Sequence, residues 1–183
     1  MQRQLIVPAV ESLLKAIEGP TLRKDLIDTP DRVYRALEEM LSGYETDIDS
    51  LFKTFDGEGT DQLVIVKNVE FSSFCEHHFL PFSGSANVAY LPNNKVIGAS
   101  KIPRLVLAYA HRLQLQERIA EQVANTLMQK LEPLGVAVII KGEHLCMRCR
   151  GVKSTNCSII NSIMLGSFRD NPALRMEVLE LLR

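Results

Sequence analysis

Residues 135–146 have the sequence GVAVIIKGEHLC, and this stretch decides the class of fold. Its first part, residues 136–140, is apolar at every position and rich in β-branched side chains, which is typical of a strand buried on both faces. We expect the strand to continue through His144 to Cys146. Side chains two residues apart on a strand share one face, so this imidazole and this thiol are predicted to lie together.

The chain on both sides of this strand supplies a sheet and its covering helices. Further strands are predicted over residues 63–66 with 69–71, 85–91, 95–97 and 155–165, and helices over residues 102–131, with a break near 113–115, and 173–182. Two long strands, then two helices, then two long strands predict an α+β fold with an antiparallel sheet.

A helical region precedes the sheet. Residues 3–18 carry apolar side chains at helical spacing, and Asp28-Thr29-Pro30 is a strong helix start in which Thr29 can cap the N-terminus. The polar, glycine-containing segment 56–61 follows as a boundary. We therefore predict an N-terminal helical region over residues 1–58 and a main domain over residues 59–183.

The composition excludes several classes of protein. The 183-residue chain has 21 Lys and Arg against 22 Asp and Glu, whereas a dedicated nucleic-acid-binding protein usually carries a basic excess. The longest early apolar run, residues 5–10, is interrupted by Pro8 and is too short for a signal-peptide core or a membrane helix. We therefore predict a cytoplasmic protein with no nucleic-acid or membrane partner, in which thiols stay reduced.

The segment Cys75-Glu76-His77-His78 concentrates titratable side chains between phenylalanines. Cys75 and His78 have a C-x-x-H spacing, with which both can bind one metal ion if the backbone turns there. An isolated C-x-x-H is a weak signal, and one buried cysteine beside two surface histidines is the alternative interpretation.

A second cluster, at residues 144–149, leaves two kinds of metal site open. Cys75, His78 and Cys146 can bind zinc with a free fourth position, which is typical of a catalytic site. Alternatively Cys149 completes a closed, structural site. The spacing by itself slightly favours the closed site.

The two remaining histidines of the constellation, His77 and His144, favour the open site instead. A structural metal site needs no neighbouring proton carriers. A catalytic metal does need them beside its activated water, and histidine titrates near neutral pH.

Residues 98–104 leave a predicted strand and open a helix. Lys101 and Arg104 are three residues apart, hence on one helical face near a positively polarised N-terminus, which suits a phosphate group. Two solvated surface charges are the alternative. Glu117 and Arg150 are further candidates for ligand contacts, the alternatives being an exposed helix glutamate and a turn arginine.

Taken together, these motifs resemble GTP cyclohydrolase I. The resemblance is collinear from about residue 20 onward, and the joint pattern is far more specific than its parts. The matching stretches are Thr29-Pro30-x-Arg32-Val33, Cys75-Glu76-His77-His78, Val88-Ala89-Tyr90-Leu91-Pro92, Val96-Ile97-Gly98-Ala99-Ser100-Lys101 with Arg104, Gln114-x-Gln116-Glu117-Arg118, His144-x-Cys146-Met147 with Arg150-Gly151-Val152, and Gly166-Ser167-Phe168-Arg169.

The resemblance implies the tunnelling fold, an antiparallel sheet with two helices on one face, for the catalytic domain over residues 59–183. It implies a toroidal homodecamer with active sites at subunit interfaces. The implied reaction converts GTP and water to 7,8-dihydroneopterin triphosphate and formate, which begins tetrahydrofolate, other pterin and deazapurine biosynthesis. The implied zinc (Zn2+) ligands are Cys75, His78 and Cys146, which leaves Cys149 outside the site.

The resemblance also implies roles for the other polar residues. His144 protonates N7 of guanine, His77 protonates the ribose ring oxygen, and Ser100 takes part in rearranging the opened sugar. Glu117, with Gln116 nearby, holds the guanine N1 and 2-amino hydrogens. The implied triphosphate ligands are Lys101, Arg104, Arg150 and, from a neighbouring subunit, Arg32.

The sequence departs from the family pattern at residues 153–162. Many members carry Ser-x-Thr-x-Thr-Ser here, whereas this chain has Cys157-Ser158-Ile159-Ile160-Asn161-Ser162, without either threonine. Neutral change in a strand between subunits is the preferred interpretation, and altered assembly or substrate tuning is the alternative. The departure motivates one rival function, a non-catalytic zinc-stabilised scaffold that binds guanine nucleotides. A sister enzyme of the same fold is a further rival, against which the complete C-E-H-H and H-x-C motifs argue.

Overall fold

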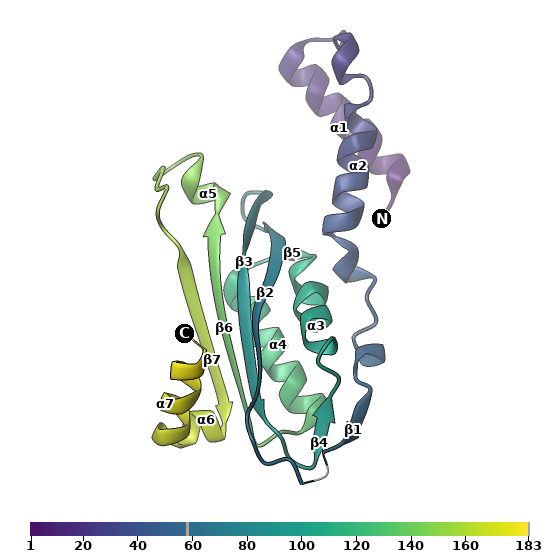
Figure 1. Cartoon of the computed structure of the whole chain (residues 1–183). Coiled ribbons are helices and arrows are strands. Elements are labelled where there is room, and N and C mark those ends of the chain that lie inside the picture. Colours follow the sequence, from purple (N-terminus) through teal and green to yellow (C-terminus); the bar gives the residue numbers. More distant parts are fainter. Residues whose placement is uncertain (58, 183) are drawn as a thin grey trace.

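The computed structural model describes residues 1–57 and 59–182. Its centre is a five-stranded sheet in the order β5–β2–β3–β6–β7 (Figure 1). Every neighbouring pair is antiparallel except the short parallel pair of β2 with β5, so the predicted sheet is confirmed. The strands are β2 (Val64–Cys75), β3 (Leu80–Leu91), β5 (Leu113–Gln114), β6 (Gly135–His144) and β7 (Ile159–Gly166).

The strand register decides which residues meet at each end of this sheet. Cys75 pairs with Leu80 across β2 and β3, and Phe82 pairs with His144 across β3 and β6. We call the end that carries Cys75 and His144 the upper end, as drawn in Figure 1, and the end that carries Leu91 the lower end. The 12 residues of β3 separate the two ends by about 36 Å at about 3.3 Å per residue.

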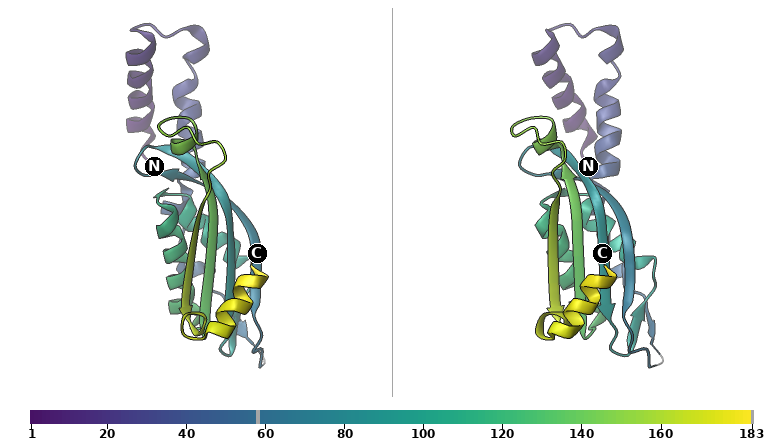
Figure 2. Two further views of the ribbon diagram at one scale, coloured as in Figure 1. Left: turned by 90° about the vertical axis from the view of Figure 1, so that its left-hand side faces the viewer. Right: turned by 60° about the vertical axis from the view of Figure 1, so that its left-hand side comes forward.

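Two helices, α3 (Lys101–Ala110) and α4 (Gln116–Leu131), cover one face of the sheet (Figures 1 and 2). Alternate residues of the strands pack against the apolar stripes of these two helices. Burying each large apolar side chain there contributes about 1.5–3 kcal/mol to the stability of the fold. The predicted break between these helices is β5. The core they form includes Phe71, Val88, Ile102, Leu105, Ile119, Val123, Leu127, Val138 and Ile140.

The other face of the sheet is covered only near its lower end (Figure 2). Two short helices, α6 (Ser167–Asp170) and α7 (Pro172–Leu181), pack there around Phe168 and Val178. Asn171 caps α7, because its side chain accepts hydrogen bonds from the backbone of Ala173 and Leu174. The sheet therefore carries helices on both faces, and α7 confirms the closing helix predicted over residues 173–182.

The N-terminal helices form a hairpin that projects past the upper end of the sheet (Figure 1). From the hairpin the chain descends beside the sheet, where β1 pairs with β4, and Leu51 joins the main core. Residue 58, at the predicted domain boundary, lies outside the described residues, and the division into two regions stays a prediction. The elements are α1 (Arg3–Glu18), η1 (Lys24–Leu26), α2 (Thr29–Met40), η2 (Ser42–Tyr44), η3 (Asp49–Leu51), β1 (Thr54–Asp56) and β4 (Lys95–Ile97).

A close backbone contact joins the hairpin to the main domain. The amide of Gly43 donates to the carbonyl of His111 at 3.0 Å, and Arg112 Nε donates to the carbonyl of Gly43 at 3.1 Å. A Cβ atom at position 43 would lie 2.3 Å from the carbonyl oxygen of Ala108. Only glycine therefore permits this approach of η2 to the end of α3.

The structure corrects the prediction that the strand from residue 136 continues to Cys146. β6 ends at His144, and the short helix α5 (Leu145–Arg148) follows. No ladder partner extends the sheet beyond this point in the described residues, because β3 pairs with β6 up to Phe82 and β7 starts opposite Gly142. The backbone polar groups of this segment form hydrogen bonds within a helical turn instead, in which the amide of Cys149 donates to the carbonyl of Leu145.

Two smaller predictions also change. Thr29 is the first residue of α2 rather than its cap, and Asp28 occupies the N-cap position. The last strand begins at Ile159 rather than at residue 155. Among the described residues, no helix combines the length and apolar character needed to cross a membrane. The cytoplasmic location stays a prediction.

Replacing Gly43 by alanine should lower the free energy of unfolding by about 1–3 kcal/mol, because the new methyl group overlaps a backbone oxygen that cannot move alone. Equilibrium denaturation in urea measures this. Gly98→Ala is the matched control, because a Cβ atom there meets its neighbours at ordinary contact distances of 3.7 and 3.8 Å. Equal stability of the two variants would contradict the close contact at Gly43.

Candidate metal centre and active site

Three side chains meet at the upper end of the sheet in the geometry of a metal centre. The ligand atoms of Cys75, His78 and Cys146 all lie within 4.8 Å of one another. Cys75 is the last residue of β2, and the backbone turns directly after it, with the amides of His78 and Phe79 donating to the carbonyl of Cys75. The turn that a C-x-x-H metal site requires is therefore present.

The donor set suits zinc. Two thiols and one imidazole are soft ligands that zinc prefers, and three protein ligands leave a fourth position, as in catalytic zinc sites. Burial and then the neighbouring Cys75 raise the pKa of the Cys146 thiol, while Arg150 acts in the opposite direction. A bound cation would favour the thiolate form.

Cys149 does not belong to this group of ligands among the described residues. Its thiol is exposed and donates to the carbonyl of Leu145 at 2.8 Å. The helical turn after His144 directs Cys146, rather than Cys149, toward Cys75. The arrangement fits the open, three-ligand interpretation rather than the closed one.

His144 lies beside the metal ligands with its ring fixed in place. The ring stacks on Phe82, with centroids 4.5 Å apart and planes 4° from parallel. Its Nδ1 is buried without a hydrogen-bond partner in the described part of the chain. Burial lowers the pKa of His144, and the nearby carboxylate of Glu117 partly opposes this. The His144 ring is thus held against an aromatic ring, close enough to Glu117 for that carboxylate to influence its pKa.

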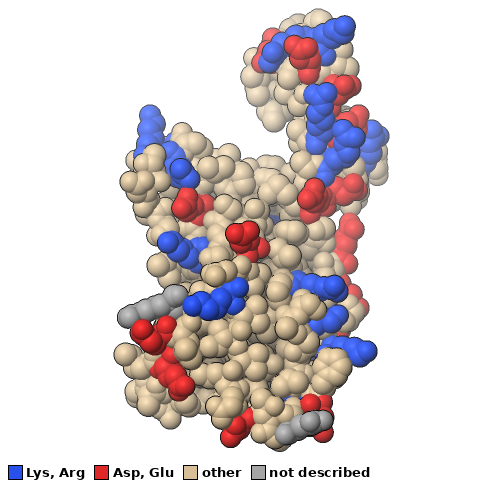
Figure 3. All heavy atoms as spheres, in the orientation of Figure 1, with Lys and Arg blue, Asp and Glu red and all other residues tan. Residues whose placement is uncertain are grey.

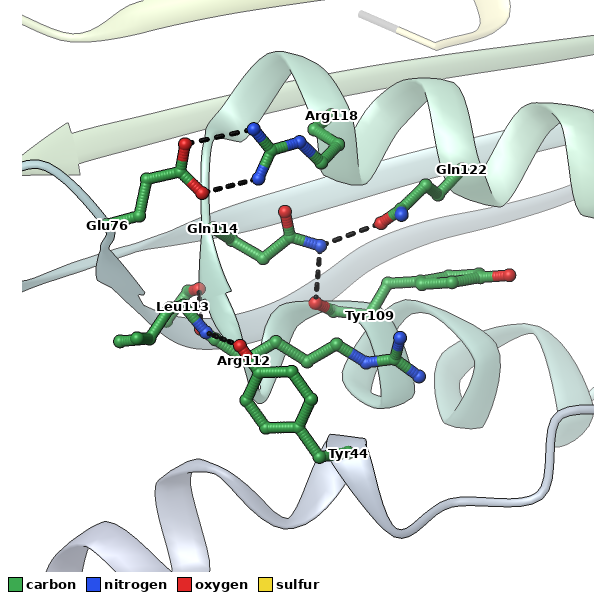
Figure 4. A network of polar contacts seen from close by, with 9 residues as sticks. Tyr44, Glu76, Tyr109, Arg112, Leu113, Gln114, Arg118 and Gln122 are labelled. Atoms are coloured by element: carbon green, nitrogen blue, oxygen red, sulfur yellow. Dashed lines mark hydrogen bonds and ion pairs between the residues drawn. The ribbon is translucent and has the colours of Figure 1, made fainter.

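The turn that carries His78 is tied to the start of α4. Glu76 accepts two hydrogen bonds from Arg118, at 2.5 and 2.9 Å (Figure 4). The hydrogen bonds from Arg118 lower the pKa of Glu76. Arg118 directly follows Glu117, so this pair holds the metal-binding turn against the helix that presents the carboxylate. His77 is exposed in the same turn, with its ring 6.2 Å from that of His78.

A buried glutamine holds β5 in place next to Cys75. Gln114 pairs with Cys75, and its Nε2 donates to the Tyr109 carbonyl at 3.0 Å and to Gln122 at 2.7 Å (Figure 4). Figure 4 also shows Tyr44 of η2 accepting from the amide of Leu113 at the same joint. The hairpin contact, β5 and the metal-binding strand thus form one connected structure.

Gln116, predicted as a substrate ligand, is completely buried. Its Nε2 lies within hydrogen-bond distance of the carbonyls of Ile140 and Ile159 and of Asn161 Oδ1. The side chain therefore points into the protein, under the exposed Glu117. A buried amide in this position holds the first turn of α4 on the sheet.

The predicted phosphate ligands come from three separate parts of the fold. Arg150 lies near Cys146 at the upper end, as its effect on the thiol shows. Ser100, Lys101 and Arg104 belong to the start of α3, which follows β4 at the lower end (Figure 1). Arg32 lies on the hairpin, where Lys and Arg side chains gather (Figure 3), and pairs with Asp28 at 3.4 Å. One chain therefore brings together only part of the predicted site.

Sequence reasoning missed three contacts of this site. Arg118 lies within a quoted motif, and Phe82 is one of the phenylalanines around residues 75–78, but a pattern of residue types assigns no partner to either. Asn161 was noted only as a departure from the family pattern. Each contact joins residues far apart in the chain, so spacing along the sequence carries no signal for it.

Comparison with known proteins agrees with this geometry. The family model described as GTP cyclohydrolase I matches residues 6–183. The chain belongs to the GTP cyclohydrolase I family. This membership, with the antiparallel sheet and the α3–α4 layer on one face, confirms the predicted tunnelling fold and the predicted family.

Relatives of this family match over almost the whole chain. GTP cyclohydrolase 1 of Leptospira biflexa is 46% identical over 175 residues, covering 95% of this chain and 96% of the relative. GTP cyclohydrolase 1 of Listeria welshimeri is 46% identical over 184 residues, covering 100% and 97%. Among solved structures, an archaeosine synthase QueF-Like in the apo form aligns with a TM-score of 0.48 at 20% identity, covering 57% of this chain and 93% of that one.

The three-ligand geometry separates the roles of two neighbouring cysteines. Cys146→Ser should lose bound zinc, because a serine hydroxyl is a poor replacement for a thiolate ligand. Cys149→Ser should keep one zinc per chain, since its thiol contacts a carbonyl and not the ligand group. Metal analysis of both purified variants after dialysis measures this. Loss of zinc from Cys149→Ser alone would establish the closed site instead.

Proposed function

We propose that this protein is a zinc-dependent GTP cyclohydrolase I, which converts GTP and water to 7,8-dihydroneopterin triphosphate and formate. One observation carries the proposal: Cys75, His78 and Cys146 converge beside His144 and Glu117 in a member of this family. The residues fit a single zinc ion with an open position. Zinc bound there would supply hydroxide near neutral pH by lowering the pKa of water.

His144 is the general acid of the opening step in this proposal. It donates a proton to N7 of guanine, which makes C8 electrophilic toward water, and the imidazole ring of the base then opens. Stacking on Phe82 keeps the ring plane constant during the transfer. His77, exposed beside His78, protonates the ribose ring oxygen, and Ser100 takes part in the sugar rearrangement.

Recognition of the base is assigned to Glu117. An exposed carboxylate at the start of α4 can accept from both N1–H and the 2-amino group of guanine. Adenine offers no matching pair of donors and would leave the carboxylate unpaired, which strongly disfavours it. Gln116 contributes indirectly to base recognition, because its buried amide fixes the first turn of α4 on the sheet.

The triphosphate requires a second copy of the chain. Lys101 and Arg104 lie in the first turns of α3, a ten-residue helix that runs about 15 Å at about 1.5 Å per residue before the chain reaches β5 beside Cys75. Arg150 lies at the upper end and Arg32 on the hairpin. We therefore assign the base and zinc to one copy, and Lys101, Arg104 and Ser100 to its neighbour.

The sheet itself offers the means of joining copies. Within the described sheet, β7 is one edge strand, and β2 forms most of the other edge, since β5 pairs with it only at Phe74 and Cys75. Open edges bind further strands through backbone hydrogen bonds. Pairing of β7 with β2 of the next copy closes a ring, and two such rings make the proposed toroidal decamer.

Turnover is tested directly with purified, zinc-loaded protein and GTP. Formate release and pterin fluorescence after mild oxidation should both appear, and both should vanish in a chelated sample. Formate without a pterin would place the defect after ring opening, at Ser100 and the ribose. Bound but unreacted GTP would overturn the catalytic proposal and support the scaffold.

The shared site is tested by mixing two inactive variants. Glu117→Ala and Lys101→Ala should each lose about 100-fold in kcat/KM, because each removes a charge-assisted contact to the substrate. Rings reassembled from equal amounts of both should recover about one quarter of wild-type activity, since each intact site takes one end from each copy. A mixture no more active than its components would contradict a site between subunits.

A further inference from the structure

The altered strand at residues 157–162 makes one contact that the proposed chemistry does not use. Asn161 is the third residue of β7, and it stands where the family pattern has a threonine. Its Oδ1 accepts a hydrogen bond from Gln116 Nε2 at 2.6 Å. This is the shortest of the contacts made by that amide, the carbonyls of Ile159 and Ile140 lying at 3.0 and 3.2 Å.

Only the nitrogen of the Gln116 side-chain amide forms hydrogen bonds in the described residues. Its hydrogen bonds in the described residues all run through Nε2, while Oε1 is buried without a partner. A primary amide has two hydrogens for these three acceptors, so the nearest acceptor has the largest share in deciding its orientation. Asn161 is also the one side chain among these acceptors. It therefore joins β7 to the first turn of α4.

The space for this amide is built into β6. A Cβ atom at Gly142 would lie 2.3 Å from Gln116 Oε1, so any other residue there would displace the side chain. Gly142 and Asn161 thus fix the position of the same amide. Gly142 leaves space for it, and Asn161 accepts a hydrogen bond from it. Glu117 follows Gln116 directly and shares its helical turn, so a shift of that turn moves the carboxylate.

We propose that Asn161 is a positioning residue for base recognition, which acts through Gln116 to set the place of the Glu117 carboxylate. The inference rests on the proposed function, because it concerns binding of the guanine edge. Two hydrogen bonds to N1–H and the 2-amino group require the carboxylate to be placed within a few tenths of an ångström, since such bonds weaken steeply when misaligned. The altered strand thereby tunes substrate binding.

Steady-state kinetics of Asn161→Leu test this. Leucine has a similar size and offers no acceptor, so KM for GTP should rise by about tenfold while kcat stays within about twofold, the pattern of lost uniform binding. The preference for GTP over inosine triphosphate, which lacks the 2-amino group, should fall by a similar factor. Zinc content should stay at the wild-type value, because Asn161 contacts no ligand.

Three further variants separate positioning from general damage. Asn161→Asp keeps an oxygen at the same place and should restore the KM and the base preference. Ser162→Ala, the neighbouring exposed position on the opposite face of β7, should leave both unchanged. Gly142→Ala should reproduce the effect of Asn161→Leu from the other side of the amide.

Each possible result of these experiments either supports the positioning role of Asn161 or overturns it. Unchanged KM and base preference in Asn161→Leu, with active wild type, would overturn this inference and leave the proposed function intact. A fall in kcat with loss of zinc would also overturn it, since that indicates disruption of the metal centre. Absence of turnover in the wild type would overturn the proposed function and the inference with it.

Discussion

The pairing of Phe82 with His144 across β3 and β6 is the constraint on which the metal centre depends. It ends the central ladder at the proposed general acid, His144, and the chain beyond it turns into α5. Because β2 and β3 are joined by the short turn after Cys75, the same register brings Cys146 to Cys75 and His78. A slip of one residue would send His144 to the other face of the sheet and dismantle the site.

Polar groups buried around this point give the site its rigidity. His144 is stacked on Phe82, Gln114 holds β5, and Gln116 holds the first turn of α4, each with little exposure to solvent. The hydrogen bonds that the buried amides of Gln114 and Gln116 donate would be lost in other arrangements, so these two side chains favour the observed one. Preorganisation of this kind suits a reaction that needs an acid, a metal and a carboxylate in constant relative positions.

The length of α3 separates two parts of the predicted site. The ten residues of α3, about 15 Å at about 1.5 Å per residue, lie between Lys101 and the chain segment that reaches β5 beside Cys75. In the proposed assembly, the base contacts of one copy meet the phosphate contacts of the next. Assembly through the open edges of β7 and β2 would then be a condition of activity and not only of stability.

The sequence by itself determined the order of the long strands and helices, the family, and the residue types of the candidate metal centre. These follow from local periodicity and from motifs whose members lie within a few residues of one another, such as Cys75 and His78. Only the tertiary structure decided that β6 stops at His144, that Cys149 stands apart from the ligands, and that Gln116 is buried against Asn161. The reason is physical: where a strand ends, and which way an amide points, depend on partners more than twenty residues away along the chain, and spacing along the sequence does not encode them.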